Sequence, residues 1–574
     1  MHPRGSSRAF SARAPLRASA AFADADVRAL LEGEPDPSVA YEADLDAYLT
    51  RRFLPWGMAG ERLVIATADG CAENLAWLEA AYDRASIASI SPSDFNREIA
   101  RRFGARLSSD AVYSLFLKTP ELSAYTVITR IQTVALASAA SAIAVAFWNW
   151  PYASAPILVA IMSAGFVIST AFRAALAFFG SRQSLDNSYA EERSPDEELP
   201  VYTILVPLFR EVAVLPQLAA SLSKLDYPRE KLDIKFIVEE DDSETRAMAE
   251  RLAGGGPFEV ICVPYSLPRT KPKACNYALR FARGDYLVIY DAEDRPEPDQ
   301  MRKAAAAFRG QPLTTACLQA RLAIENAAES WLSLIFALDY AVWFKALLPG
   351  LDRFGVPMPL GGTSNHFRIS VLREAGGWDP FNVTEDADLG IRLAQLGYRV
   401  SMLDSTTFEE APAQLGPWLR QRSRWLKGYM QTWLVHAREP ASLLERVGFR
   451  GVAVIQLFIG GGVWSALVNP LLWLIYIVSC AQPDTGEGLQ SLETLALISG
   501  VGLLSANIML AWIAIADSRR MNRPWVIFYG LSFIFYWALV SLAAYRGLWQ
   551  LVFDPFYWEK TPHGAKRANA GSEA

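Results

Sequence analysis

Long runs without charged residues divide the chain into membrane-like and soluble parts. The first run covers residues 131–172, and three more follow at 451–483, 494–516 and 524–545. Because a helix needs about 20 apolar residues to cross a bilayer, the first run is long enough for two helices, with a turn near Pro151. The pattern predicts an integral, multi-pass membrane protein.

The number of crossings depends on how the second run is divided. This run is longer than one span and is interrupted at Asn469-Pro470. If its first part lies at the interface as an amphipathic helix, the chain crosses the membrane five times and its C-terminus lies outside. If any run contains an extra crossing, the count is six and the C-terminus is cytoplasmic.

Charged residues between the runs predict the orientation. Arg519, Arg520 and Arg523 separate the last two runs, whereas the segment 484–493 carries three acidic residues. Cytoplasmic loops are enriched in Lys and Arg, so the N-terminal region and the large middle segment are both expected in the cytoplasm. Residues 1–33 contain arginines but no apolar core, which is typical of a flexible basic tail rather than a cleaved signal peptide.

The soluble parts show alternating strand and helix patterns. In the first part, residues 62–67 and 86–90 are predicted strands, each followed by a helical pattern, which indicates a small docking or stabilising domain. In the middle segment, apolar strands are predicted at 201–206, 234–238, 258–263 and 286–290. Such alternation predicts a mainly parallel sheet that binds its ligand at the carboxyl ends of the strands.

Acidic residues gather where those strands end. Residues 239–242 (EEDD) follow the second strand, residues 291–294 (DAED) follow the fourth, and Thr384-Glu385-Asp386 follows a Gly-rich loop. Carboxylates in this position suit Mg²⁺ or Mn²⁺, which prefer oxygen ligands and can neutralise a diphosphate. Helix N-capping is the alternative explanation for any single cluster.

Basic residues accompany the acidic clusters. One set precedes the helix at 273–283, and a second lies within Arg420–Lys427. Cations beside a metal-bound diphosphate would stabilise charge on the departing phosphate. A solvated or membrane-facing basic face is the alternative for the second set, although it does not account for the unit Gln421-Arg-Ser-Arg-Trp425.

Composition excludes several other classes. Hydrophobic residues make up 52% of the 574 residues and the net charge is −6, so a polycation that binds nucleic acid is not expected. The five cysteines show no CxxC spacing and only four histidines occur, which argues against a disulfide scaffold and a zinc site. No GxGxxG follows the first strand of the middle segment, which disfavours a Rossmann dehydrogenase.

Two motifs of the middle segment resemble a known family. QxxRW (Gln421, Arg424, Trp425) and TED (384–386) together are similar to membrane-embedded family 2 glycosyltransferases with a GT-A catalytic domain, the group that includes bacterial cellulose, curdlan and hyaluronan synthases. Within that group, the phrases at 291–298 and 557–564 look closest to XagB-like exopolysaccharide synthases. The similarity covers residues 201–433 and the flanking helices.

The resemblance implies an α/β fold in which a GT-A nucleotide-sugar transferase domain is inserted between transmembrane α-helices, plus a small N-terminal α/β domain. The expected divisions are a basic tail (1–33), the small cytoplasmic domain (34–118), a transmembrane hairpin (125–179), the GT-A domain (196–440), an interface helix with further transmembrane helices (441–546) and a C-terminal segment with a gating motif (547–574).

Roles are carried over by position from the family's motifs. The resemblance assigns catalysis to Asp386 as general base, with Glu385 and Thr384. It assigns donor binding to Pro207, Glu211, Glu240, Asp241, Lys271, Lys273, Asp291, Gln421 and Arg424. It assigns acceptor contacts to Trp425, Gly362, Thr363 and His366, metal binding to Asp291 and Glu293, and gating to Trp558, Lys560 and Thr561. Glutamate replaces aspartate at 240 and 293, so any acid of 239–242 could contact uracil, and Asp294 competes with Glu293 for the metal.

The expected function is a processive inverting transferase that builds an extracellular polysaccharide from a UDP-sugar and passes it through the bacterial inner membrane. The alternative is a non-processive transferase that acts on a lipid acceptor. A transporter or receptor whose soluble domain merely binds nucleotide is a further rival. The implied partners are a UDP-sugar, Mg²⁺ or Mn²⁺, a growing glycan, the bilayer and secretion proteins of the cell envelope.

Overall fold

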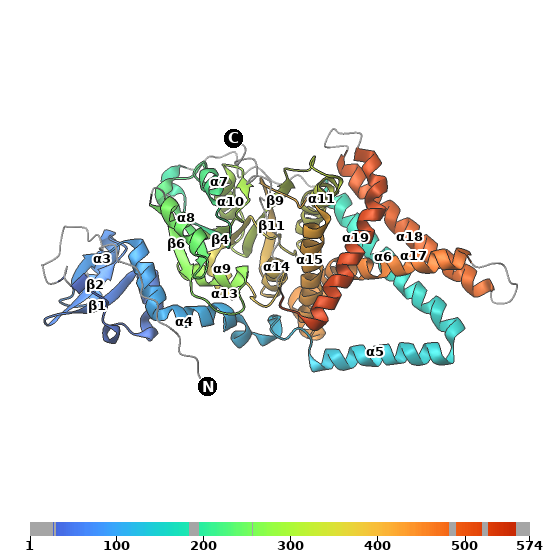
Figure 1. The fold of residues 1–574 in the computed structure, drawn as a ribbon, viewed down its shortest axis with the longest axis horizontal. Helices are drawn as coiled ribbons and strands as arrows, with labels where there is room; N and C mark the ends of the chain where they lie inside the picture. Colours follow the sequence, from blue (N-terminus) through green and yellow to red (C-terminus); the bar gives the residue numbers. More distant parts are fainter. Residues whose placement is uncertain are drawn as a thin grey trace.

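The computed structural model describes residues 27, 30, 31, 33–182, 195–254, 257–481, 489–518 and 526–557. Along its longest axis the chain forms three parts: a small N-terminal domain, a larger α/β domain, and a group of long helices at the opposite end (Figure 1). The predicted α/β fold with a separate small N-terminal α/β domain is therefore confirmed.

The N-terminal domain is built on a three-stranded sheet in the order β1-β2-β3. Strands β1 and β2 are antiparallel, whereas β2 and β3 are parallel. Phe53, Ile65 and Leu78 are fully buried between this sheet and its helices. The elements are η1 (Pro37–Val39), η2 (Glu42–Asp44), α2 (Leu45–Arg51), β1 (Phe53–Ala59), β2 (Arg62–Thr67), α3 (Ala72–Ala81), β3 (Ser86–Ser89) and α4 (Pro92–Lys118).

Helix α4 joins the N-terminal domain to the central domain. It begins at an N-cap in which the Ser91 side chain accepts a hydrogen bond from the backbone N–H of Asp94. Its 27 residues run beneath the central domain toward the long helices (Figure 1). The turn η3 (Pro120–Leu122) follows, so the chain reaches the membrane helices only after it has passed along the central domain.

A buried ionic cluster fixes the N-terminal domain against the central sheet. The Glu259 carboxylate on β6 pairs with Lys235 on β5 and with Arg52 of the N-terminal domain, the latter at 2.7 Å. The Asn96 side chain on α4 also donates to Glu259, at 2.7 Å. Because these charges are largely out of water, their pairing ties the two domains together.

The central sheet has eight strands in the order β6-β5-β4-β7-β10-β9-β11-β8. Strands β6, β5, β4 and β7 are parallel, as are β9 and β11, whereas β10 and β8 run antiparallel to their neighbours. This agrees with the predicted mainly parallel sheet. The strands are β4 (Tyr202–Leu208), β5 (Leu232–Glu239), β6 (Phe258–Val263), β7 (Tyr286–Ile289), β8 (Arg295–Pro296), β9 (Thr315–Ile324), β10 (Asn365–Arg368) and β11 (Arg399–Glu409).

Helices cover both faces of this sheet. In β4, Ile204 and Val206 belong to one hydrophobic core and Leu205 belongs to the other. Apolar residues on both faces are expected of parallel strands between two helical layers. The soluble helices and short turns are η4 (Asp196–Glu198), α7 (Leu215–Leu222), η5 (Arg229–Lys231), α8 (Ser243–Ala253), α9 (Lys271–Leu279), α10 (Gln300–Gly310), α13 (Ile369–Glu374), α14 (Glu385–Gln395) and α15 (Leu415–His436).

Four helices among the described residues are long and apolar enough to cross a membrane: Arg130–Asn149, Pro151–Gly180, Trp331–Phe354 and Pro440–Ala481. They comprise α5, α6, the α11–η6–α12 unit and the α16–η7–α17 unit. The bounds are α5 (Arg130–Asn149), α6 (Pro151–Gly180), α11 (Trp331–Val342), η6 (Trp343–Leu347), α12 (Leu348–Phe354), α16 (Pro440–Val454), η7 (Ile455–Gly460), α17 (Gly461–Ala481), α18 (Leu489–Ser518) and α19 (Val526–Phe553).

The long helices that precede the central domain in the sequence meet those that follow it, beside that domain. Helix α19 lies against α15, and α6 lies against α17 and α18 (Figure 1). The unit α11–η6–α12 was not among the uncharged runs because Asp339 and Lys345 interrupt it. The loops at 482–488 and 519–525, whose charges predicted the orientation, lie outside the described residues, as does most of the N-terminal tail.

Candidate active site

A cavity of about 510 Å³ lies at the carboxyl ends of β4 and β7. Its wall continues from the central sheet to α14 and α15, and then to Arg173 of α6, Gly462 of α17 and Tyr536 of α19. The predicted site residues that line it are Pro207, Glu211, Lys271, Asp291, Glu293, Gly362, Thr363, Thr384, Glu385, Asp386, Gln421, Arg424 and Trp425. One cavity thus joins the acidic end of the sheet to the membrane helices.

Lys271 brings a positive charge to the acidic end of the cavity. Its Nζ lies 2.6 Å from Oδ1 of Asp291 and donates to the carbonyl oxygen of Gly362 at 2.7 Å. Burial opposes the charged form, but Asp291, Asp386 and Glu385 outweigh it and raise the pKa of Lys271. The lysine is therefore a permanent cation, suited to a phosphate oxygen.

Asp291 and Glu293, the residues expected to bind a divalent cation, both line the cavity. Asp294 serves the loop instead: it is buried, it accepts the backbone N–H of Asp291 at 2.7 Å, and it accepts the hydroxyl of Thr363. Within the described ranges, no three Asp, Glu, His or Cys side chains come close enough to hold a metal by themselves. Two carboxylates completed by diphosphate oxygens fit Mg²⁺ or Mn²⁺, which bind proteins through few carboxylates plus substrate phosphates.

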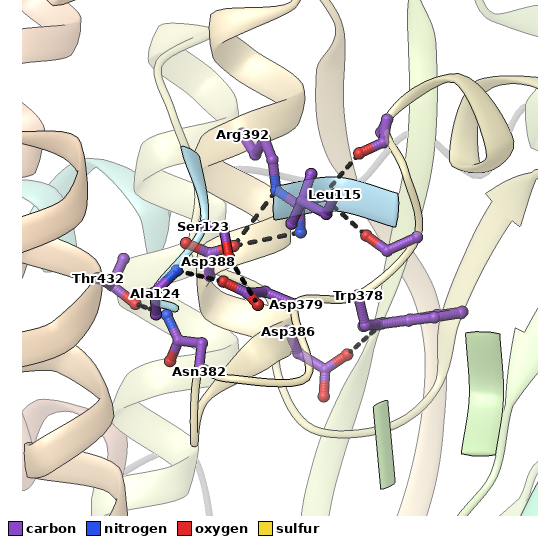
Figure 2. Close-up of polar contacts among 12 residues, drawn as sticks. Leu115, Ser123, Ala124, Trp378, Asp379, Asn382, Asp386, Asp388, Arg392 and Thr432 are labelled. Atoms are coloured by element: carbon purple, nitrogen blue, oxygen red, sulfur yellow. Dashed lines mark hydrogen bonds and ion pairs between the residues drawn. The ribbon is translucent and has the colours of Figure 1, made fainter. Parts of the chain in front are cut away.

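Asp386 lies in the first turn of α14 and is only 5% exposed. Its Oδ1 accepts the indole N–H of Trp378 at 2.9 Å (Figure 2). Burial, and next the neighbouring Glu385, raise the pKa of Asp386 well above its ordinary range, while Lys271 opposes this shift. A carboxylate whose pKa is raised toward neutrality can accept a proton from a hydroxyl group.

Helix α15 presents its motif to the cavity from one face. Arg424 and Trp425 follow Gln421 by three and four positions, so both lie on the same side of the helix as Gln421. Burial lowers the pKa of Arg424, although Glu385 and Asp291 oppose the change. The Trp425 ring packs on Tyr340, with centroids 6.0 Å apart and planes at 27°.

Arg422, from the same motif, anchors α15 to the membrane side. Its Nη2 lies 2.9 Å from Oδ2 of Asp339 on α11 and donates to the hydroxyl of Tyr536 on α19 at 2.6 Å. Its guanidinium carbon also lies 4.9 Å from the centre of the Trp425 ring. This positioning role was not predicted, because its partners are remote in sequence and carry no local signal.

The structure corrects the assignment of His366. It is fully buried on β10, where Nδ1 lies 2.7 Å from the Tyr202 hydroxyl and Nε2 lies 3.2 Å from Oε1 of Gln300. Burial lowers its pKa to about 3, so the ring is neutral. With both nitrogens engaged inside the core, His366 is a structural residue and does not reach the cavity.

Among the four acids at 239–242, the structure places Glu239 on the cavity wall. Its carboxylate pairs with the buried Lys273 at 2.9 Å, and burial raises its pKa. Glu240 and Asp241 are not in the wall: Glu240 accepts the backbone N–H of Tyr265 at 3.0 Å, and Asp241 pairs with Arg269. Lys273 therefore supports Glu239 rather than lining the cavity itself.

Phe209 and Glu409 are two of the wall residues that were not predicted. Phe209, just after β4, lies 4.7 Å from the guanidinium carbon of Arg269 and offers a flat face. Glu409 ends β11, and burial together with Glu293 raises its pKa to about 8. Its position immediately past a strand is the same signal that identified the other acidic clusters.

The predicted gating residues Trp558, Lys560 and Thr561 lie outside the described residues. The segment just before them is held against α15, because Lys427 donates to the carbonyl oxygen of Tyr557 at 2.6 Å and Gln431 donates to that of Pro555 at 3.0 Å. The described C-terminal segment therefore ends next to the helix that carries the QxxRW motif.

Comparison with known proteins agrees with this geometry. Residues 203–368 match the model of glycosyl transferase family 2, and residues 286–549 match that of glycosyl transferase family group 2. A probable glucomannan 4-beta-mannosyltransferase from Oryza sativa subsp. japonica is 24% identical over 251 residues, 42% of each chain. A beta-monoglucosyldiacylglycerol synthase from Trichormus variabilis is 27% identical over 241 residues, 41% of this chain and 50% of the other.

A solved structure also overlays on this chain. The mannosyltransferase PcManGT from Pyrobaculum calidifontis, in complex with GDP-Man and Mn²⁺, is 16% identical with a TM-score of 0.41, over 69% of this chain and 99% of its own. The present chain spans about half the length of the curated relatives it matches. The two family matches overlap and together span residues 203–549, so this part of the chain is similar to glycosyltransferase family 2 and the protein is a glycosyltransferase.

Proposed function

We propose that this protein is an inverting glycosyltransferase that adds sugars repeatedly from a UDP-sugar to a growing glycan at the cytoplasmic face of the bacterial inner membrane. The observation that carries the proposal is the continuity of one cavity, which runs from Asp291 and Lys271 past Asp386 to Trp425 and the helices α6, α17 and α19. Acidic and basic side chains line the donor end of the cavity, whereas mainly aromatic side chains line the opposite end.

The donor end suits a nucleoside diphosphate. Phe209 and Pro207 supply apolar surface for the base, and Lys271 and Arg424 supply cations for the phosphates. A divalent cation held by Asp291 and Glu293 would neutralise negative charge on the diphosphate leaving group. In that arrangement Lys271 exchanges its carboxylate partner for a phosphate oxygen.

The proposal assigns the role of base to Asp386. Its free oxygen would accept the proton of the acceptor hydroxyl while that oxygen forms a bond to C1 of the sugar and the bond from C1 to the diphosphate breaks. Attack opposite the leaving group inverts the configuration at C1 in one step, and UDP leaves with the electron pair. No covalent enzyme intermediate is required.

The membrane end supports a glycan acceptor. Trp425 packs on Tyr340 and Phe336, and Trp343 and Tyr429 continue the aromatic wall. Aromatic faces pack on the apolar C–H faces of sugar rings, so this wall suits the terminal sugars of a glycan. A lipid acceptor is the second candidate, supported by the membrane helices and by the named activity of the Trichormus relative.

The proposal is tested with the full chain in lipid nanodiscs, supplied with a panel of UDP-sugars and either Mg²⁺, Mn²⁺ or EDTA. We expect a long polymer with either cation and loss of turnover in EDTA. Asp386→Asn should lower turnover by roughly 10²- to 10⁴-fold and leave UDP binding within about threefold, because the carboxylate acts only on the acceptor.

Asp83→Asn provides a matched control, since this aspartate side chain is 95% exposed in the N-terminal domain and should retain full activity. Turnover by Asp386→Asn at the wild-type rate would refute the proposed base. A product limited to one sugar on a lipid would replace the polymerase with the second candidate.

A further inference from the structure

The loop before α14 holds the Trp378 side chain next to Asp386, the proposed base. Trp378 is 1% exposed, and its indole N–H donates to Oδ1 of Asp386 at 2.9 Å (Figure 2). Two preceding glycines, Gly376 and Gly377, have φ of +80° and +68°, a conformation that residues with a Cβ rarely adopt. The turn that these glycines permit brings the indole back toward the helix that follows.

Asn276 on α9 fixes the backbone of that tryptophan. Its Oδ1 accepts the N–H of Trp378 at 2.9 Å, and its Nδ2 donates to the Trp378 carbonyl oxygen at 2.7 Å. A Cβ on Gly377 would lie 2.2 Å from Oδ1 of Asn276, so this close packing requires a glycine. The amide therefore sets both the position and the direction of the Trp378 peptide.

The N-terminal helix α4 completes the support. Nδ2 of Asn276 also donates to the carbonyl oxygen of Ala111 on α4, at 3.0 Å. Just beyond α4, the backbone N–H of Ala124 and the hydroxyl of Ser123 donate to Asp379, at 2.5 and 3.3 Å (Figure 2). Two neighbouring residues of the loop, 378 and 379, are thus bonded to the N-terminal part of the chain.

We propose that Trp378 is a positioning residue for Asp386, and that α4 holds it in place through Asn276. The inference rests on the proposed base role of Asp386. The indole N–H engages one carboxylate oxygen, so the other oxygen keeps a fixed direction toward the acceptor hydroxyl. This gives the N-terminal domain and α4 a part in catalysis although neither lines the cavity.

The hydrogen bond also favours the charged carboxylate, because an N–H donor stabilises the anion. The other groups that act on Asp386 are Glu385 on the same helix, Lys271 on α9, Asp291 after β7 and Arg424 on α15. All four remain when the indole is replaced by a phenyl ring. A change in the pH dependence of Trp378→Phe can therefore be assigned to the missing N–H.

The decisive variant is Trp378→Phe, which keeps a buried aromatic ring and removes the donor. We expect kcat to fall roughly 10-fold, as for loss of one hydrogen bond to a charged group, while KM for the UDP-sugar stays within about twofold. The acid limb of the pH profile should move to higher pH, because Asp386 loses a group that lowers its pKa. Trp56→Phe is the control: this equally buried indole donates to the carbonyl oxygen of Leu30 in the N-terminal domain.

A folded Trp378→Phe protein with wild-type kcat and an unmoved acid limb would overturn the positioning role, even if Asp386→Asn is inactive. If Asp386→Asn is active, the proposed function itself fails. Asn276→Leu tests the link to α4 and should lower kcat in the same direction. A folded Asn276→Leu protein with wild-type kcat would remove α4 from the proposal.

Discussion

A single close approach connects the two motifs of the active site, and filling it gives a sharp test. Gly428 lies on α15, one turn after the QxxRW motif, with the side chain of Thr384 packed over its Cα. A Cβ at this position would lie 2.2 Å from Oγ1 and 2.4 Å from Cγ2 of Thr384. We expect Gly428→Ala to displace Thr384 and, with it, the following Glu385 and Asp386.

The size of the effect follows from these distances. Non-bonded heavy atoms pack at about 3.5 Å or more, so Thr384 must move by more than about 1 Å. Overpacking of a core costs about 1–3 kcal/mol, and alanine regains about 0.5–1 kcal/mol through its helix propensity. The net loss of stability is therefore about 0–2.5 kcal/mol, whereas a shift of about 1 Å at the proposed base can lower turnover by roughly 100-fold.

The assay compares turnover and thermal unfolding of Gly428→Ala with those of Gly254→Ala. Gly254 is the C-cap residue of α8 and has a helical backbone conformation, and a Cβ there would approach no atom closer than 3.6 Å. Gly254→Ala should keep wild-type turnover and unfold at the wild-type temperature or slightly above it, and Gly428→Ala should lose activity while it remains folded. Wild-type turnover by Gly428→Ala would refute the claim that the contact between α15 and Thr384 sets the position of the proposed base, Asp386.

Two further predictions concern buried charges away from the cavity. Glu259→Gln should lower the free energy of unfolding by about 3–5 kcal/mol, because Arg52 loses this carboxylate and Lys235 is left with Asp233 alone. Denaturant titration should show no comparable loss for the exposed ion-pair variant Glu250→Gln. Burial, and next Asp388, raise the pKa of Asp379 to about 6, so the stability that its protonated form adds is complete below about pH 4 and is lost as the pH rises through 6. The unfolding temperature of the wild type minus that of Asp379→Asn should therefore decrease between about pH 4 and pH 6. A difference that stays constant over this range would contradict the raised pKa of Asp379.

Local sequence patterns were sufficient to predict which residues line much of the cavity. Asp291 and Glu293 follow a buried strand, and the carboxyl ends of parallel strands meet at one edge of a sheet, so their place in the cavity follows from strand order. Gln421, Arg424 and Trp425 share a helix face because of their spacing. Glu409 obeys the same strand-end rule as Asp291.

Other features could not be read from the sequence. His366 occurs beside a Gly-rich loop that does line the cavity, yet its side chain enters the core because alternate residues of a strand point to opposite faces. Arg422 has the same local sequence signal as Arg424, and only the approach of α11 and α19 gives it a different set of partners. The part played by Glu239 depends on Lys273, which is 34 positions away.

Local residue patterns specify the uncharged helices, the alternating α/β segments and the two motifs, because hydrophobic periodicity and strand-end chemistry depend on residues close together in the chain. Only long-range packing brings the long apolar helices and the acidic end of the sheet to one cavity. It also decided that Trp378 meets Asp386 with support from α4. These contacts join residues 8 to 256 positions apart through a turn and through domain packing, and no local pattern specifies such distances.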